Sequence, residues 1–71
     1  MFDHRNAELT NAQLRAKTLA IAECKRTGKM ANSYCPNGEG DAYAYPGAEG
    51  KIHWGVNGSD GINIARDVIP G

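Results

Sequence analysis

The chain lacks a net charge and a long apolar run, and each absence excludes a class of function. Eight Lys and Arg residues balance eight Asp and Glu residues in a chain of 71 residues. A neutral chain produces no long-range field that would steer it toward nucleic acid or an anionic membrane. No apolar segment approaches the roughly 20 residues that a membrane-spanning helix needs, and the polar N-terminus does not resemble a signal peptide. We therefore expect a cytoplasmic protein with no membrane partner.

Soft metal ligands are also scarce, because the chain has two Cys and two His residues. Structural zinc sites normally use a close pair such as C-x2-C, whereas ten residues separate Cys24 from Cys35. We expect two ordinary reduced thiols, with Cys24 in the core and Cys35 partly exposed in a loop. The alternative is that folding gathers Cys24, Cys35 and His53 around a metal ion. Our prediction is no metal, no cofactor and no obligatory disulfide.

No combination of nucleophile and base stands out in the sequence. Cys35 and His53, with Asp41 or Asp60, supply the residue types that cysteine chemistry needs, but nothing in their spacing supports a site. The glycines near residue 40 lack both the P-loop pattern and the helix that should follow it. The chain is also short for an enzyme that must enclose a substrate. We expect no catalytic residues and a protein that is not an enzyme.

Large apolar residues are few, and nine glycines raise the entropic cost of folding. A chain of this length forms a single domain near the lower limit for an unaided core, with about 3–5 kcal/mol of stability. Such a domain gains stability by association with itself or with a larger partner. We expect one domain over residues 1–71, with residues 1–8 as a flexible arm.

The clearest local signal is the start of a helix at Thr10. Thr10 suits the N-cap, and Gln13 three residues later completes a capping box. Gly28 suits a left-handed C-cap, so the helix is predicted over residues 11–27. Its apolar residues form two stripes, either of which could face a core. One stripe carries Leu14, Thr18, Ile21 and Cys24, and the other carries Ala12, Ala16, Leu19 and Ala20.

After Gly28 the apolar period changes from helical to alternating. Residues 41–45, 51–56 and 62–65 read as strands joined by glycine-rich turns of hairpin length. The predicted fold is α+β, with one N-terminal helix packed on a small three-stranded antiparallel β-meander. Residues 29–40 are expected to be an irregular connection. A competing interpretation makes residues 61–69 a short helix capped by Ser59 or Asp60.

The alternation also predicts which side chains are buried. Ile52, Trp54 and Val56 share one face of the second strand, so Trp54 should lie between helix and sheet. In the third strand, Ile62 and Ile64 are expected to face the core.

The direction of the first predicted strand stays open. Tyr43 and Tyr45 either point into the core or point outward to form an exposed face with Lys51 and His53. An exposed aromatic and basic face can stack nucleobases or anchor a protein partner. With Tyr34 from the preceding connection, the candidate partner-binding residues are Tyr34, Tyr43, Tyr45, Lys51 and His53.

We therefore expect a small protein-binding module, an inhibitor or adaptor that blocks the surface of a partner. Free-standing proteins of this size are often encoded by phages or mobile elements and block a host enzyme or defence complex; this expectation comes from the size class and not from any residue. The alternative is a small nucleic-acid-binding domain. It would use either the Tyr/Lys/His face or the basic helix residues Arg15, Lys25 and Arg26.

Overall fold

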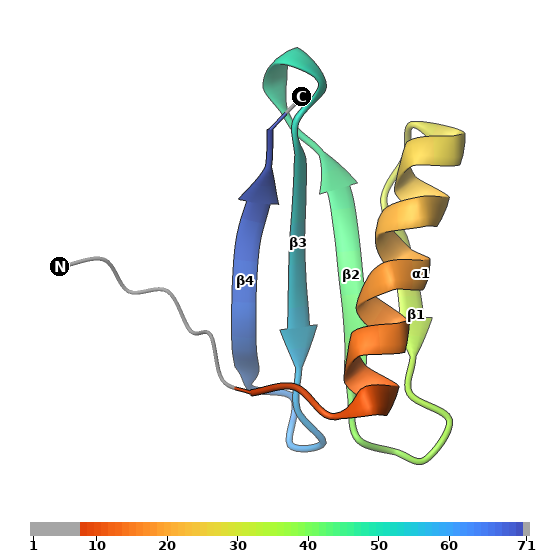
Figure 1. Cartoon of the computed structure of the whole chain (residues 1–71), viewed down its shortest axis with the longest axis vertical. Helices are drawn as coiled ribbons and strands as arrows, with labels where there is room; N and C mark the ends of the chain where they lie inside the picture. The colour runs from red at the N-terminus through yellow and green to blue at the C-terminus, as the bar shows by residue number, and fades with distance from the viewer. Residues whose placement is uncertain (1–7, 71) are drawn as a thin grey trace, which may run out of the picture.

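The computed structural model describes residues 8–70, which form one helix packed on a four-stranded antiparallel sheet (Figure 1). The α+β class is confirmed, and the expected number of three strands is wrong by one. The predicted flexible arm, apart from Glu8, lies outside the described residues. The elements are α1 (Asn11–Thr27), β1 (Ala31–Tyr34), β2 (Asp41–Pro46), a 3-10 turn (Ala48–Gly50), β3 (Ile52–Asn57) and β4 (Asn63–Ile69), and the strands lie side by side in chain order.

The helix begins and ends where its capping residues predict. The Thr10 hydroxyl accepts from the Gln13 backbone N–H at 3.2 Å, and the Gln13 side chain accepts from the Thr10 N–H at 3.0 Å. Gly28 has a φ of 73°, and its N–H donates to the Cys24 carbonyl at 2.8 Å. These local contacts confirm both ends of α1. Within residues 8–70, no helix combines the length and apolar character needed to cross a bilayer.

The buried stripe of α1 consists mostly of small residues and combines parts of the two expected stripes, since it takes Ala16 and Ala20 from one and Cys24 from the other. Leu14 and Leu19, one from each expected stripe, are 44% and 54% exposed. The buried residues follow the i, i+3, i+7, i+11 spacing between those stripes, so the helix axis can approach the sheet closely. They are Gln13, Ala16, Ala20 and Cys24.

The sheet meets α1 with a face that is also rich in small residues. Trp54 is buried on this face together with Ile52 and Val56, which confirms the predicted strand alternation. The Lys17 amino group lies over the Trp54 ring, 4.1 Å from its centroid. The remaining buried apolar residues of the sheet and the segment after β1 are Ala31, Cys35, Ala42, Ala44 and Ala65.

The sequence did not predict β1, which lies in the expected irregular connection. Its four residues pair antiparallel with β2, with Ala31 opposite Ala44. Ala, Asn and Ser have little intrinsic strand preference, so pairing and the packing of α1 over Ala31 stabilise the strand instead. The fold also buries Cys35, which is 5% exposed. Its expected place as a partly exposed loop thiol is therefore wrong.

β4 corrects two expectations for the end of the chain. Residues 63–69 form a strand, so a short helix over 61–69 is wrong. A β-bulge opposite the end of β3 inserts Ile64 as an extra residue, which shifts the alternation by one position. Ala65 consequently faces the core, while Ile64 is only partly buried and Ile62, before the strand, is 57% exposed. The prediction that Ile62 faces the core is therefore wrong, whereas Ile64 packs against the core as expected, although it is only partly buried.

Candidate binding surface on the open face of the sheet

The helix covers one face of the sheet, where it packs against β1, β2 and β3 (Figure 1). Residues 8–70 contain no second helix of comparable length that could cover the opposite face. Ala42 and Ala44 are fully buried beneath α1, so the alternation of β2 turns Tyr43 and Tyr45 to this opposite face. The structure thereby resolves the direction that the sequence left open, and we call this surface the open face.

Three aromatic side chains stack in a row on the open face. The rings of Tyr43 and Tyr45 are nearly parallel, with centroids 6.2 Å apart and planes at 13°. Tyr45 stacks more closely on His53, its partner across β2 and β3, at 4.9 Å and 4°. We call these three residues the aromatic row. Since each ring restricts its neighbour, the row loses little side-chain entropy on binding.

Two glycines make room for the ring at each end of the row. A Cβ atom at Gly55 would lie 2.3 Å from the Tyr43 hydroxyl, and one at Gly47 would lie 2.6 Å from the His53 ring. Neither glycine has a positive φ, so the backbone conformation does not require a glycine at either position. A glycine is needed because a larger residue would collide with the neighbouring ring. A glycine inside a strand often marks such a close approach. Gly55, which lies inside a predicted strand, is the sequence signal that indicates this close approach.

A hollow of about 290 Å³ lies beside the aromatic row. Its volume falls at the lower end of ligand pockets, which suits one side chain or one base better than a cofactor. The sequence analysis missed its β4 residues, because their alternation depends on the bulge. The hollow is lined by Tyr43, Tyr45, His53, Trp54, Arg66, Asp67 and Val68.

The two other predicted contact residues lie at the margins of the open face. Tyr34 is exposed at the end of β1, opposite Asp41, whereas Lys51 is exposed just before β3 at the other end of the sheet. The structure therefore brings Tyr43, Tyr45 and His53 together and leaves Tyr34 and Lys51 outside this cluster.

The alternative basic surface on the helix is less compact. Arg15 precedes Arg26 by eleven residues, which corresponds to roughly 16 Å along a helix. Arg15 lies instead beside a second hollow of about 200 Å³, shared with Asn11, Ala12 and Pro36. Along the helix, the predicted basic residues are thus spread out.

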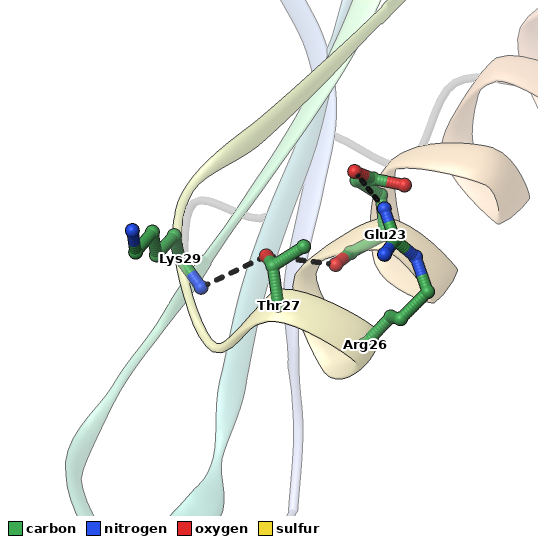
Figure 2. A network of polar contacts seen from close by, with 4 residues as sticks. All are labelled: Glu23, Arg26, Thr27 and Lys29. Atoms are coloured by element: carbon green, nitrogen blue, oxygen red, sulfur yellow. Dashed lines mark hydrogen bonds and ion pairs between the residues drawn. The ribbon is translucent and has the colours of Figure 1, made fainter.

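The basic end of α1 is partly neutralised by an ion pair. Arg26 forms an ion pair with Glu23, with Nη2 and Oε2 2.5 Å apart. Figure 2 shows this pair and the Lys29 side chain pointing away from it. The hydrogen bond and charge of Arg26 lower the pKa of Glu23, and those of Glu23 raise the pKa of Arg26. The Thr27 hydroxyl donates to the Glu23 carbonyl at 3.0 Å and accepts from the Lys29 N–H at 3.1 Å. These contacts explain how the C-terminal turn is held, but they offer no hollow to a ligand.

The thiols lie apart from the open face. Cys24 and Cys35 are free and buried, while His53 is on the opposite side of the sheet, so folding does not gather these three residues. Among residues 8–70, no three His, Cys, Asp or Glu side chains are placed to share a metal ion. Burial raises the pKa of Cys35, and the charges of Glu39 and Asp41 raise it further. A protonated, buried thiol is a poor nucleophile.

Comparisons with protein families, curated proteins and solved structures find no match for this chain. The functional argument therefore depends on the geometry of the open face.

Proposed function

We propose that this chain is a small protein-binding module, an inhibitor or adaptor that covers the surface of a larger protein with its open face. The observation that carries the proposal is the stacked row of Tyr43, Tyr45 and His53 on a sheet face that α1 does not cover. Tyrosine is enriched in the energetically important centres of protein interfaces. A row that is already ordered can contribute contact area at low entropic cost.

The distribution of apolar residues supports the same proposal. The core consists largely of alanines, while Tyr34, Tyr45 and Val68 remain exposed on the open face. Single exposed apolar residues are common, but several on one face beside a hollow are typical of an interaction surface. A partner that covers this face would also stabilise the small domain by binding its folded state.

A nucleic-acid-binding function is the second candidate. Stacked aromatic rings on an open sheet face, with Arg66 beside them, are a known arrangement for stacking bases. The zero net charge disfavours this function. Binding to heparin or to a mixed single-stranded oligonucleotide, falling steeply as salt rises, would identify it.

The test is capture of partners from the native host, followed by mass spectrometry. Tyr45→Ser removes the centre of the aromatic row at a side chain that is already 41% exposed, so the fold should survive. We expect this variant to lose a partner that the wild type retains. Leu19→Ala is the matched control, because it removes a similarly exposed apolar side chain from α1.

Equal capture by the wild type and Tyr45→Ser would contradict the proposal. Loss of capture on substitution of Arg15 and Lys25 by Ser would instead move the interface to the helix. The expected role in blocking a host enzyme or defence complex stays a prediction, which the identity of the captured partner tests.

A further inference from the structure

β1 forms one outer edge of the sheet, and part of its backbone points away from the fold. The Cys35 N–H donates to the Gly40 carbonyl at 2.9 Å, so Cys35 and every second residue before it form the hydrogen-bonded pairs with β2. The intervening residues, Asn32 and Tyr34, turn their N–H and C=O groups outward. Among residues 8–70, no hydrogen bond is made to these outward groups. The edge of β1 can therefore accept another strand.

The edge of β1 is not protected against strand pairing, whereas the opposite edge is. Charged side chains, prolines and bulges are the usual means of protecting an edge strand. β1 has none of these, since its residues Ala-Asn-Ser-Tyr are uncharged and pair with β2 in a regular register. β4 differs, because it contains a bulge and its Val68 N–H donates to the Asp67 carboxylate at 2.8 Å.

Two contacts show which side of α1 lies along the β1 edge. On one side of the helix, the Lys17 amino group lies over Trp54 in β3. On the other side, Ala12 and Arg15 share a hollow with Pro36, which follows the end of β1. Figure 1 shows α1 in front of β1, at the edge of the sheet. The side of α1 that carries Arg15 therefore faces outward above the β1 edge.

An exposed ridge runs along this side of α1. Arg15, Leu19 and Glu23 follow one another at intervals of four residues, so they lie on one face of the helix. All three are exposed, and the apolar Leu19 lies between the two opposite charges. The order basic, apolar, acidic is self-complementary. A second copy turned by 180° about Leu19 places each charge opposite its counterpart.

The ridge and the strand edge have the same midpoint. α1 and β1 run in opposite directions, because only residues 28–30 connect them. Pro36 lies level with residues 11–15 of α1, and Ser33 lies about 10 Å from it along an extended chain. The same distance along a helix is about six or seven residues, which brings Leu19 level with Ser33. A single two-fold axis can therefore pass both residues.

We infer that two copies of this chain form a two-fold dimer through β1, with Ser33 opposite Ser33 of the second copy. In this register, Asn32 of each copy forms a hydrogen-bonded pair with Tyr34 of the other, and each pair exchanges two backbone hydrogen bonds. The two serines occupy the closer, non-hydrogen-bonded position, where their hydroxyls can bond to each other. The two four-stranded sheets become one continuous sheet, with both open faces on the same side.

The ridge selects a second copy over an unrelated strand. In the dimer the two helices lie side by side, separated by two to three strand spacings, about 10–14 Å, which long side chains can span. Leu19 meets Leu19 of the second copy on the axis, and on either side Arg15 lies opposite Glu23. The Glu23 Oε2 atom already binds Arg26, which leaves Oε1 for the incoming guanidinium.

The first test measures association and locates it. Sedimentation equilibrium from micromolar to millimolar protein should show a monomer–dimer equilibrium, which is weak because the interface is small. Over the same concentrations, amide exchange measured by NMR should slow at Asn32 and Tyr34. The amides of Ala31 and Ser33 already bond to β2 and serve as internal controls.

The second test reverses charges on the ridge. Arg15→Glu and Glu23→Arg each place two like-charge pairs across the axis, so each variant should dimerise about tenfold more weakly. An equimolar mixture of the two variants should recover association, because each copy then supplies the charge that the other lacks. Lys25→Glu is the matched control, since it changes the net charge as Arg15→Glu does but lies off the ridge.

The third test removes a backbone donor from the edge. Asn32→Pro deletes the outward N–H of Asn32, and proline is tolerated on an edge strand where this group faces solvent. The variant should keep the circular dichroism spectrum of the monomer and lose the dimer. If it fails to fold, the charge variants still decide, because Arg15 and Glu23 are exposed.

Three outcomes would overturn the inference. They are a monomer at millimolar concentration, a dimer in which the Asn32 and Tyr34 amides exchange as in the monomer, and no recovery in the mixture of charge variants. The inference goes beyond the proposed function, and the two can fail separately. A monomer that loses its partner on Tyr45→Ser supports the open face and rejects the dimer, whereas a dimer that captures no partner does the reverse. Leu19→Ala should weaken the dimer without affecting capture by the dilute monomer.

Discussion

Gly55→Ala should disturb the aromatic row through a single methyl group. The added Cβ would lie 2.3 Å from the Tyr43 hydroxyl oxygen and 2.4 Å from the ring carbon that carries it. Ordinary contacts to a Cβ begin near 3.4 Å, so the ring has to move by about 1 Å or more. Because Tyr43 stacks on Tyr45, which stacks on His53, the displacement would pass along the row.

Two effects of opposite sign set the size of the change. Overpacking typically costs about 1–3 kcal/mol. Replacing glycine by alanine also restricts the unfolded chain and returns about 0.4–1 kcal/mol. We expect a net loss of about 1–2 kcal/mol, which is a large fraction of the roughly 3–5 kcal/mol available to a domain of this size.

A double-mutant cycle measures the coupling between the two residues. Urea unfolding followed by circular dichroism would be recorded for the wild type, Gly55→Ala, Tyr43→Ala and the double variant. Without the Tyr43 ring, Gly55→Ala should stabilise by about 0.4–1 kcal/mol, so the sign of its effect reverses. If Gly55→Ala destabilises equally in both backgrounds, the ring does not lie over Gly55 and the described row is wrong.

Four further predictions follow from the remainder of the fold. Thr10→Ala should lower stability by about 0.5–2 kcal/mol, because it removes the N-cap and also the hydrogen bond from the Thr10 hydroxyl to the Glu39 carboxylate; an unchanged urea midpoint would contradict this. Trp54 should show blue-shifted fluorescence that iodide quenches poorly, and Trp54→Ala should cost about 3–5 kcal/mol; water-like emission would contradict its burial under α1. The pKa of Cys35 is raised by burial, so the contribution of this thiol to stability is present below about pH 8.5 and is lost as the pH rises, because the unfolded thiol ionises before the folded one does. The free energies of unfolding of the wild type and of Cys35→Ala should therefore converge or cross at alkaline pH. A difference between them that does not change with pH would contradict this prediction. Cys24 and Cys35 are free thiols, so a chelator with a reductant should leave the melting temperature nearly unchanged. A large fall would show that a disulfide or a bound metal ion stabilises the fold.

The ends of α1 could be predicted from sequence because neighbouring residues determine them. The Thr10 and Gln13 side chains satisfy backbone groups within the first turn, and Gly28 adopts the left-handed conformation that ends the helix. No distant contact is needed to place either signal. The buried face of the same helix could not be predicted equally well, since the sheet selects Ala16 and Ala20 over the larger Leu14 and Leu19.

The missed features of the sheet depend on contacts between distant residues. β1 has four residues and a weak strand preference, so its structure depends on pairing with β2. The bulge at Ile64 moves Ala65 into the core, and alternation alone gives no sign of such an insertion. The hollow could not be predicted for the same reason, because Arg66 and Val68 reach the open face only after this shift.

The alternation of β2 explains both why the core has little apolar area and why the open face carries large aromatic side chains. Ala42 and Ala44 are fully buried and allow α1 to lie close to the sheet, which leaves little apolar area inside. The same alternation places the large rings of Tyr43 and Tyr45 on the open face. Gly55 and Gly47 have no side chain there and leave space for the rings at the two ends of the aromatic row. A sequence selected only for stability would gain by exchanging these two sets of residues. This arrangement supports the proposed binding function, in which a partner that covers the open face would also stabilise the small domain.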